Sequence, residues 1–190
     1  MARAGLTSDR LARAGAELAD EVGFEQVTPS ALARQFDVQV ASLYSHVRNS
    51  QDLKARIATL ALSELADEAS AAVAGRAGGD ALIALANVYR DYARAHPGRY
   101  AATRFQPDEA SPELIEAGRR HSELTRAVLR AYDLNEPAQT DAIRLLGSVF
   151  HGYVSLELAG SFSHSSPDSA ETWPRILKSL DSLLRVWSRK

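Results

Sequence analysis

A short stretch around residues 38–54 of this 190-residue sequence brings together side chains that could bind another molecule. Tyr44 and His46 lie two residues apart and end in groups that form hydrogen bonds. Just before them, Gln39 could hydrogen-bond an adenine edge, and the small side chains that follow it could touch a thymine methyl group. Arg48 and Lys54 could each neutralise a phosphate. This combination favours a double-stranded DNA partner.

Short helices must position these side chains. Thr28 followed by Pro29 predicts a helix start, because Thr is a good N-cap and Pro suits the first helical position. That helix is expected to end near Phe36, and a second should cover residues 39–46, after a first helix over residues 7–23. Three short helices with a tight turn outline a helix-turn-helix unit. Its predicted core consists of apolar side chains: Leu18, Val22, Phe24, Leu32, Phe36, Val38 and Leu43.

The rest of the chain also predicts helices, since Ala, Leu, Arg and Glu dominate and alternating β-branched runs are nearly absent. Ser50 is the predicted N-cap of a long helix over residues 51–74. Further helices are expected over residues 80–96, 99–105, 112–132, 136–160 and 169–189. The fold class is therefore all-α with about nine helices: a helix-turn-helix domain (1–50), a connecting helix (51–74) and a larger helical ligand-binding and dimerisation domain (75–190).

Several functional classes are excluded by what the sequence lacks. It contains no cysteine, which rules out disulfides, thiolate zinc sites and Cys nucleophiles. No paired carboxylates, Gly-rich phosphate loop or Ser-centred elbow suggests an enzyme or a bound cofactor. His121, His151 and Glu157 raise a metal hypothesis, but six residues separate the last two, which does not place them on one helical face. No apolar run approaches a membrane span, and the start is unlike a signal peptide, so a cytoplasmic location is expected.

The stretch Leu43-Tyr44-x-His46-Val47, with Leu53 six residues on, resembles the recognition-helix signature of the TetR family of transcriptional regulators. The resemblance is tight over residues 7–60, although Asp37 stands where the family often has Gly and Ser50 where it often has Lys. Asp can still adopt a left-handed turn conformation. Residues 151–162 look like the regulatory domain of the WHG subset. The resemblance implies a homodimeric repressor that a small apolar or amphipathic effector releases from its operator.

The DNA-binding residues expected from the chemistry and the resemblance lie in residues 28–54, where the starts of helices also present N–H groups to phosphates. They are Thr28, Ser30, Gln39, Val40, Ala41, Ser42, Tyr44, Ser45, His46, Arg48, Ser50 and Lys54. The alternative is an all-helical interaction module whose helix-turn-helix is vestigial.

Two further sites are expected in the regulatory part. Aromatic and histidine side chains could line an effector cavity: Tyr89, Tyr92, Phe105, His121, Phe150 and His151. The last two long helices carry apolar stripes, and TetR-like proteins pair these helices into a four-helix bundle. The dimer interface is accordingly predicted at Tyr153, Ile176, Leu180, Leu183, Leu184 and Trp187. In both cases the alternative is that the side chains belong to the core of one protomer.

The predicted DNA-binding region is electrically neutral, because residues 1–60 hold seven basic and seven acidic side chains. DNA binding should then depend on how charge is arranged, with Arg3, Arg48 and Lys54 facing DNA. We expect few ionic phosphate contacts and a weak dependence of DNA affinity on salt. Titrations over a range of salt concentrations check this, and a log–log slope as steep as that of a highly basic binder would contradict it.

Overall fold

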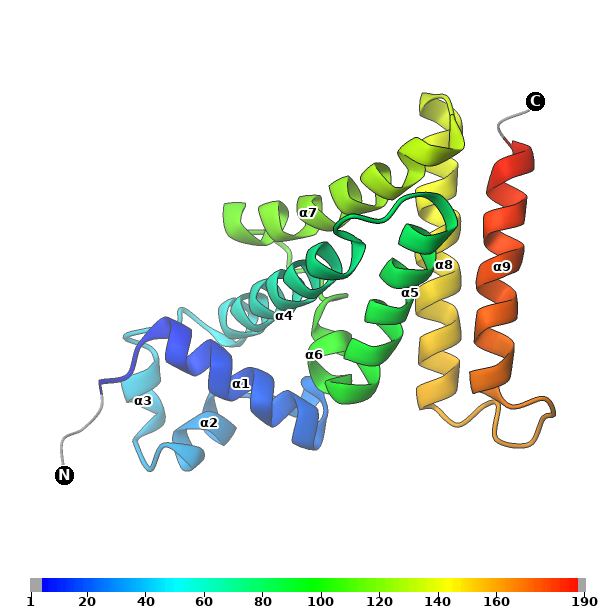
Figure 1. Ribbon diagram of the computed structural model, residues 1–190. Coiled ribbons are helices and arrows are strands. Elements are labelled where there is room, and N and C mark those ends of the chain that lie inside the picture. Colours follow the sequence, from blue (N-terminus) through cyan, green and yellow to red (C-terminus); the bar gives the residue numbers. More distant parts are fainter. Residues whose placement is uncertain (1–4, 188–190) are drawn as a thin grey trace. The chain divides into compact units, whose positions relative to one another are not determined.

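The computed structural model describes residues 5–187, and every regular element in this range is helical (Figure 1). The α-helices are α1 (Ser8–Val22), α2 (Pro29–Gln35), α3 (Val40–Leu43), α4 (Ser50–Val73), α5 (Gly78–Ala95), α6 (Pro97–Ala102), α7 (Pro112–Leu129), α8 (Glu136–Leu158) and α9 (Ser169–Trp187). Two short 3-10 helices cover Phe24–Gln26 and Arg130–Tyr132. The predicted all-α fold is confirmed. Arg3 and the predicted helix end at Arg189 lie outside the described residues.

The chain forms two compact units. The first unit contains the residues up to Glu64 together with residues 95–118, and the second unit contains residues 65–94 and those from Arg119 onward. This division differs from the predicted boundaries, which followed the order of helices along the chain. In the structure, residues 95–118 belong instead to the same unit as the N-terminal helices. The assignment of DNA binding to residues 1–50 and of regulation to residues 75–190 stays a prediction.

Side-chain caps and a small apolar core define the first unit. The hydroxyl oxygens of Thr7 and Thr28 accept hydrogen bonds from backbone N–H groups three residues on, each at 3.1 Å, so both are N-caps. Leu32 and Leu43 are fully buried as predicted, and Phe24 joins them. Leu18, Phe36 and Val38 are partly buried against this core. The prediction for Val22 was wrong: its side chain is 49% exposed at the end of α1.

The start of α6 packs directly on the end of α1. A Cβ atom on Gly98 would overlap the backbone carbonyl of Ala19, so only glycine fits. Asp20 of α1 accepts a hydrogen bond from the backbone N–H of Arg99 at 2.8 Å. This bond caps the start of α6 from a neighbouring helix, because the N-cap residue of α6, His96, forms no side-chain capping bond. The guanidinium of Arg99 also lies 3.0 Å from Asp20 and 3.2 Å from Glu64 of α4. These contacts explain why α6 belongs to the first unit.

The second unit has its own core, made by α5, α8 and α9 with the adjoining parts of α4 and α7. Trp173, Leu82 and Leu146 are almost completely buried in it. The buried polar groups have partners, as the cost of desolvation requires. The indole N–H of Trp173 donates to Asn87 at 2.9 Å, and the hydroxyl of Tyr132 donates to Asp181 at 2.6 Å.

Gly98→Ala should destabilise the protein by about 1–3 kcal/mol, because the added methyl group forces α6 away from α1. Urea unfolding followed by circular dichroism measures this change in the free energy of unfolding. Gly118→Ala is the matched control, since a Cβ there meets nothing within 4 Å and the lower chain entropy should stabilise the helix by about 0.5–1 kcal/mol. Equal effects of the two substitutions would show that the contact with Ala19 is not tight.

Candidate nucleic-acid interface

The helix-turn-helix consists of α2, a tight turn and a very short α3. Asp37 in the turn has φ = 51°, the left-handed conformation that the sequence predicted for it. The backbone N–H of Val38 then donates to the carbonyl of Ala33 at 3.0 Å and closes the turn. α3 is shorter than the predicted helix over residues 39–46. After Leu43 the chain continues in turns, in which His46 and Val47 donate backbone hydrogen bonds to the Leu43 carbonyl.

One face of α3 and the following turn points to solvent while the other is fixed in the core. Leu43 and Val47 are buried. Between them, Tyr44 leaves 52% of its surface exposed, which is unusual for a large aromatic side chain. Other residues of the predicted DNA-binding set are exposed as well: Thr28, Ser30, Gln39, Ala41, Ser42, Ser45, Arg48 and Ser50. The chain therefore presents a mostly polar surface on a firmly anchored turn.

Three residues of the predicted DNA-binding set are less accessible to a DNA partner than expected. Val40 is partly buried against the core of the first unit. The ammonium group of Lys54 lies 2.6 Å from a carboxylate oxygen of Glu25 and 5.1 Å from the centre of the Phe24 ring, and its side chain is only 15% exposed. His46 is half-buried, and its backbone carbonyl accepts a hydrogen bond from the Ser8 hydroxyl at 2.8 Å. A phosphate contact by Lys54 would require its pair with Glu25 to open.

The cap of α4 differs from the prediction. Asn49, not Ser50, is the N-cap, because the side-chain oxygen of Asn49 accepts a hydrogen bond from the backbone N–H of Asp52 at 2.9 Å. Ser50 is instead the exposed first residue of the helix. An N-cap residue followed three positions later by an acidic residue is a known start signal. That spacing in the sequence could have identified Asn49 and Asp52.

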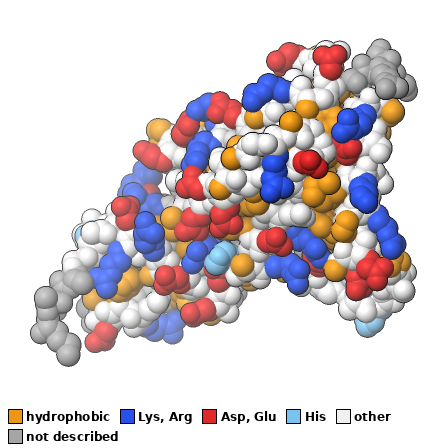
Figure 2. Space-filling model, viewed as in Figure 1, with side chains coloured by type: hydrophobic (Ala, Val, Ile, Leu, Met, Phe, Trp, Pro, Cys, Tyr) orange, Lys and Arg blue, Asp and Glu red, His pale blue; other side chains and the backbone are white. Residues whose placement is uncertain are grey.

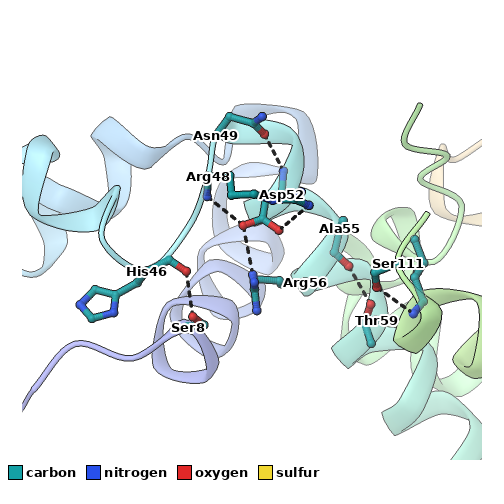
Figure 3. Close-up of polar contacts among 10 residues, drawn as sticks. Ser8, His46, Arg48, Asn49, Asp52, Ala55, Arg56, Thr59 and Ser111 are labelled. Atoms are coloured by element: carbon teal, nitrogen blue, oxygen red, sulfur yellow. Dashed lines mark hydrogen bonds and ion pairs between the residues drawn. The ribbon is translucent and has the colours of Figure 1, made fainter. Parts of the chain in front are cut away.

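Asp52 is the buried charge that organises this region (Figure 3). Its carboxylate, in a side chain that is 8% exposed, accepts hydrogen bonds from the backbone N–H of Arg48 at 2.9 Å and from the guanidinium of Arg56 at 3.3 Å. The guanidinium of Arg48 lies 3.5 Å away, and the His46 ring points away from this cluster. Burial raises the pKa of the Asp52 carboxyl, but these hydrogen bonds and the two positive charges outweigh it and lower the pKa overall.

Three of the predicted effector-site residues meet in the second unit. The hydroxyl of Tyr89 is 2.8 Å from Nδ1 of His121, and the centre of the Tyr89 ring is 5.9 Å from that of His121 and 5.9 Å from that of Phe150. Tyr92 is buried, and His151 lies 3.3 Å from the Ser155 hydroxyl. Phe105 does not join this set, because it belongs to the first unit and packs edge-on against Phe24 at 5.6 Å.

The second unit also contains a buried ion pair that the sequence did not reveal, and its guanidinium lies 5.8 Å from the centre of the Trp173 ring. Arg90 donates two hydrogen bonds to Glu157, at 2.6 and 2.8 Å, and the Ser169 hydroxyl donates a third to the same carboxylate at 2.6 Å. The bond from Arg90 is the main reason that the pKa of Glu157 is lowered and that of Arg90 is raised. Glu157, which the sequence suggested as a metal ligand, is thus the partner of Arg90.

The predicted dimer residues divide into buried and exposed ones. Leu180 and Leu184 are 7% and 0% exposed and belong to the core of the second unit, which is the alternative that the sequence left open for them. Tyr153, Ile176 and Trp187 are partly buried against the same core. Leu183 is 44% exposed. Other exposed apolar side chains near it in sequence or on α8 are Val186, Leu156 and Leu158.

Acidic and basic side chains are mixed over the visible surface (Figure 2). This agrees with the formal net charge of −2. No helix among residues 5–187 combines the length and apolar character that crossing a membrane requires.

Known proteins resemble this chain over most of its length. A family model described as the C-terminal domain of tetracyclin repressor-like proteins matches residues 82–180. The HTH-type transcriptional regulator Rv0681 of Mycobacterium tuberculosis is 32% identical over 170 residues, which cover 89% of this chain and 78% of the relative. The HTH-type transcriptional regulator YobS of Bacillus subtilis is 29% identical over 185 residues, which cover 97% and 92%. Both relatives are transcriptional regulators and not enzymes, in agreement with the prediction.

The fold also occurs in solved structures. BioQ bound to its double-stranded DNA operator aligns with a TM-score of 0.70 at 21% identity, over 95% of this chain and 99% of BioQ. At this level of identity the comparison establishes the fold alone.

Asp52→Asn should lower the free energy of unfolding by about 1–3 kcal/mol at pH 7, because an amide replaces the charged acceptor of buried hydrogen bonds. The folded state lowers the pKa of Asp52, so its stabilising effect is complete above the ordinary pKa of an aspartate and is lost as the pH falls through the folded value. Urea unfolding at pH 7 and below about pH 4 should therefore show the two proteins converging. Asp9→Asn, at an exposed residue of the same unit, is the control. If the difference in the free energy of unfolding between wild type and Asp52→Asn were the same at all pH values, the charge of Asp52 would not be the source of the stabilisation.

Proposed function

This chain belongs to the TetR family of helix-turn-helix transcriptional regulators, and we propose that it is a homodimeric repressor that binds operator DNA through α2, the turn and α3. The observation that carries this proposal is the exposure of Tyr44 between two buried anchors, Leu43 and Val47. The Tyr44 side chain is not part of the core of the first unit, so its exposure leaves it available to a partner. Its hydroxyl is suited to a phosphate oxygen.

The base contacts would come from the side chains next to Tyr44. Gln39 and Ser42 are exposed and able to hydrogen-bond base edges, and Ala41 can contact a thymine methyl group. Each well-formed base contact contributes about 1–3 kcal/mol of discrimination between sequences. Arg48, whose side chain is 79% exposed, would supply a phosphate contact while Asp52 holds its backbone in place.

Dimerisation through α8 and α9 would bring two such units to a two-fold operator, whose half-sites lie about one DNA turn apart. Gly147 and Gly152 of α8 have no side-chain or distant backbone atom within 4 Å of an added Cβ, which leaves room for the close approach of a partner helix. On α9, Leu183 and Val186 are 44% and 55% exposed. Burial of these side chains would favour association.

Release from DNA would follow from a small apolar or amphipathic effector at Tyr89, His121 and Phe150. The rings provide an apolar surface, and the hydrogen bond between Tyr89 and His121 provides polar atoms that could be exchanged for a polar group of the effector. A coupling of about 1–3 kcal/mol between effector and operator would suffice for a useful switch.

The proposal is tested by titrating the purified protein against the DNA upstream of its own gene. Wild type should bind one segment selectively. Tyr44→Ala should weaken binding by at least about 1 kcal/mol without changing the oligomeric state. Leu183→Glu should leave the fold intact but shift sedimentation to the monomer and weaken operator binding as well. The selected segment then serves as the reporter in a screen for effectors that release it.

The outcomes separate the proposal from its alternative. If the folded dimer binds no segment selectively at any salt concentration, the repressor proposal fails, and the interaction module with a vestigial helix-turn-helix replaces it. A monomeric wild type, or Leu183→Glu sedimenting as a dimer, would contradict the proposed interface. A screen in which no compound releases the operator would argue against effector control.

A further inference from the structure

A groove in the first unit adjoins the proposed DNA-binding surface, with which it shares Arg48, and contains no residue of the proposed effector site. It runs between the start of α1, the first half of α4 and residues 107–113, which lead into α7. All of its lining residues belong to the first unit. Its volume of about 680 Å³ is typical of sites that hold small organic molecules.

Part of the groove lining is apolar and built from small side chains: Ala12, Ala55, Leu60 and Pro107. Thr59 adds little polarity, because its hydroxyl donates to the carbonyl of Ala55 at 2.9 Å (Figure 3). A flat or compact apolar group could therefore lie against this surface and be removed from water.

The charged lining is acidic on balance. It contains five carboxylates and three guanidiniums, a net charge of −2. Arg48 and Arg56 already share Asp52 as their counter-ion. By contrast, the side chains of Asp9, Asp108 and Glu109 form no ion pair or hydrogen bond within residues 5–187, and neither does that of Arg13, four residues from Asp9 on α1. The loop carboxylates of Asp108 and Glu109 are therefore the ones most available to a positively charged ligand.

Glu113, the fifth of these carboxylates, is also ionised. Hydrogen bonds from its own backbone N–H and from the Ser111 hydroxyl lower the pKa of its carboxyl group, and the nearby Arg56 acts in the same direction. The carboxylate is therefore ionised at neutral pH. Among the described residues no three His, Asp or Glu side chains are placed to hold a metal ion, which makes a bare cation a poor match.

We propose that this groove binds an organic cation with an apolar body. The apolar group packs against Ala12, Ala55 and Leu60, and the positive charge lies toward Asp108 and Glu109. The proposal goes beyond the proposed function, whose effector site is in the second unit, and it holds whether or not the chain binds DNA. Because Asp52 and Arg48 form part of the wall, an occupied groove would also act on the turn proposed to contact DNA.

Calorimetric titration of the full chain without DNA tests the proposal. The probes are tetraphenylphosphonium and tetraphenylborate, which have nearly the same size and shape and opposite charge. Wild type should bind the cation in preference to the anion. Asp108→Asn combined with Glu109→Gln should weaken cation binding about tenfold at low salt, as expected for the loss of two nearby charges.

Two further variants make the test specific. Glu17→Gln with Glu21→Gln removes the same charge from exposed positions of α1 outside the groove and should leave the affinity unchanged. Ala55→Leu fills the apolar part and should also weaken binding, which keeps the test informative if the double loop variant folds poorly. The proposal is overturned if tetraphenylphosphonium does not bind, if both double variants bind it equally, or if tetraphenylborate binds as tightly.

Discussion

The contact between Gly98 and the backbone at Ala19 determines how the first unit is built. With no side chain at residue 98, α6 approaches α1 so closely that Asp20 can cap its first turn and hold Arg99, which in turn reaches Glu64 of α4. Three helices from distant parts of the sequence are thereby joined through Arg99, whose guanidinium meets Asp20 of α1 and Glu64 of α4. Residues 95–118 consequently belong to the first unit, where α6 packs on α1.

A second carboxylate, that of Asp52, holds neighbouring segments together at the surface proposed to contact DNA. A buried charge is costly unless it is paired and hydrogen-bonded, and Asp52 meets this requirement with a backbone N–H and two guanidiniums. The result is a turn after α3 whose path is fixed at Arg48 and, through the bond from Ser8, at His46. Residues 1–60 hold as many acidic as basic side chains. The proposed DNA binding would therefore depend on where individual charges such as Arg48 are held and not on an overall positive charge. Asp52 also forms part of the wall of the neighbouring groove.

Aromatic side chains of α5, α8 and α9 pack together in the core of the second unit. Phe150 and Tyr153 of α8 lie 6.1 and 4.8 Å from the Trp173 ring of α9, and Tyr89 of α5 contacts Phe150. The polar ends of this set find partners within the unit, as Trp173 does in Asn87 and Tyr89 in His121. Exposed Leu183 and Val186 remain outside this core. The interior of the second unit thus accounts for the rings, while Leu183 and Val186 of α9 are left for the interface proposed above.

Local signals in the sequence determined most of the helices and the cap at Thr28 and allowed the left-handed turn at Asp37, because each depends on interactions within a few residues. The recognition-helix pattern of residues 43–53 likewise determined the family. The sequence did not predict the cap at Asn49 or the separation of Phe105 from Tyr89, and it left open whether Leu180 and Leu184 face the core or a partner. A periodic apolar stripe shows which side of a helix is buried but not against what. Only the tertiary structure decided that residues 95–118 join the first unit and that Glu157 pairs with Arg90, since these contacts link residues 67 to 79 positions apart.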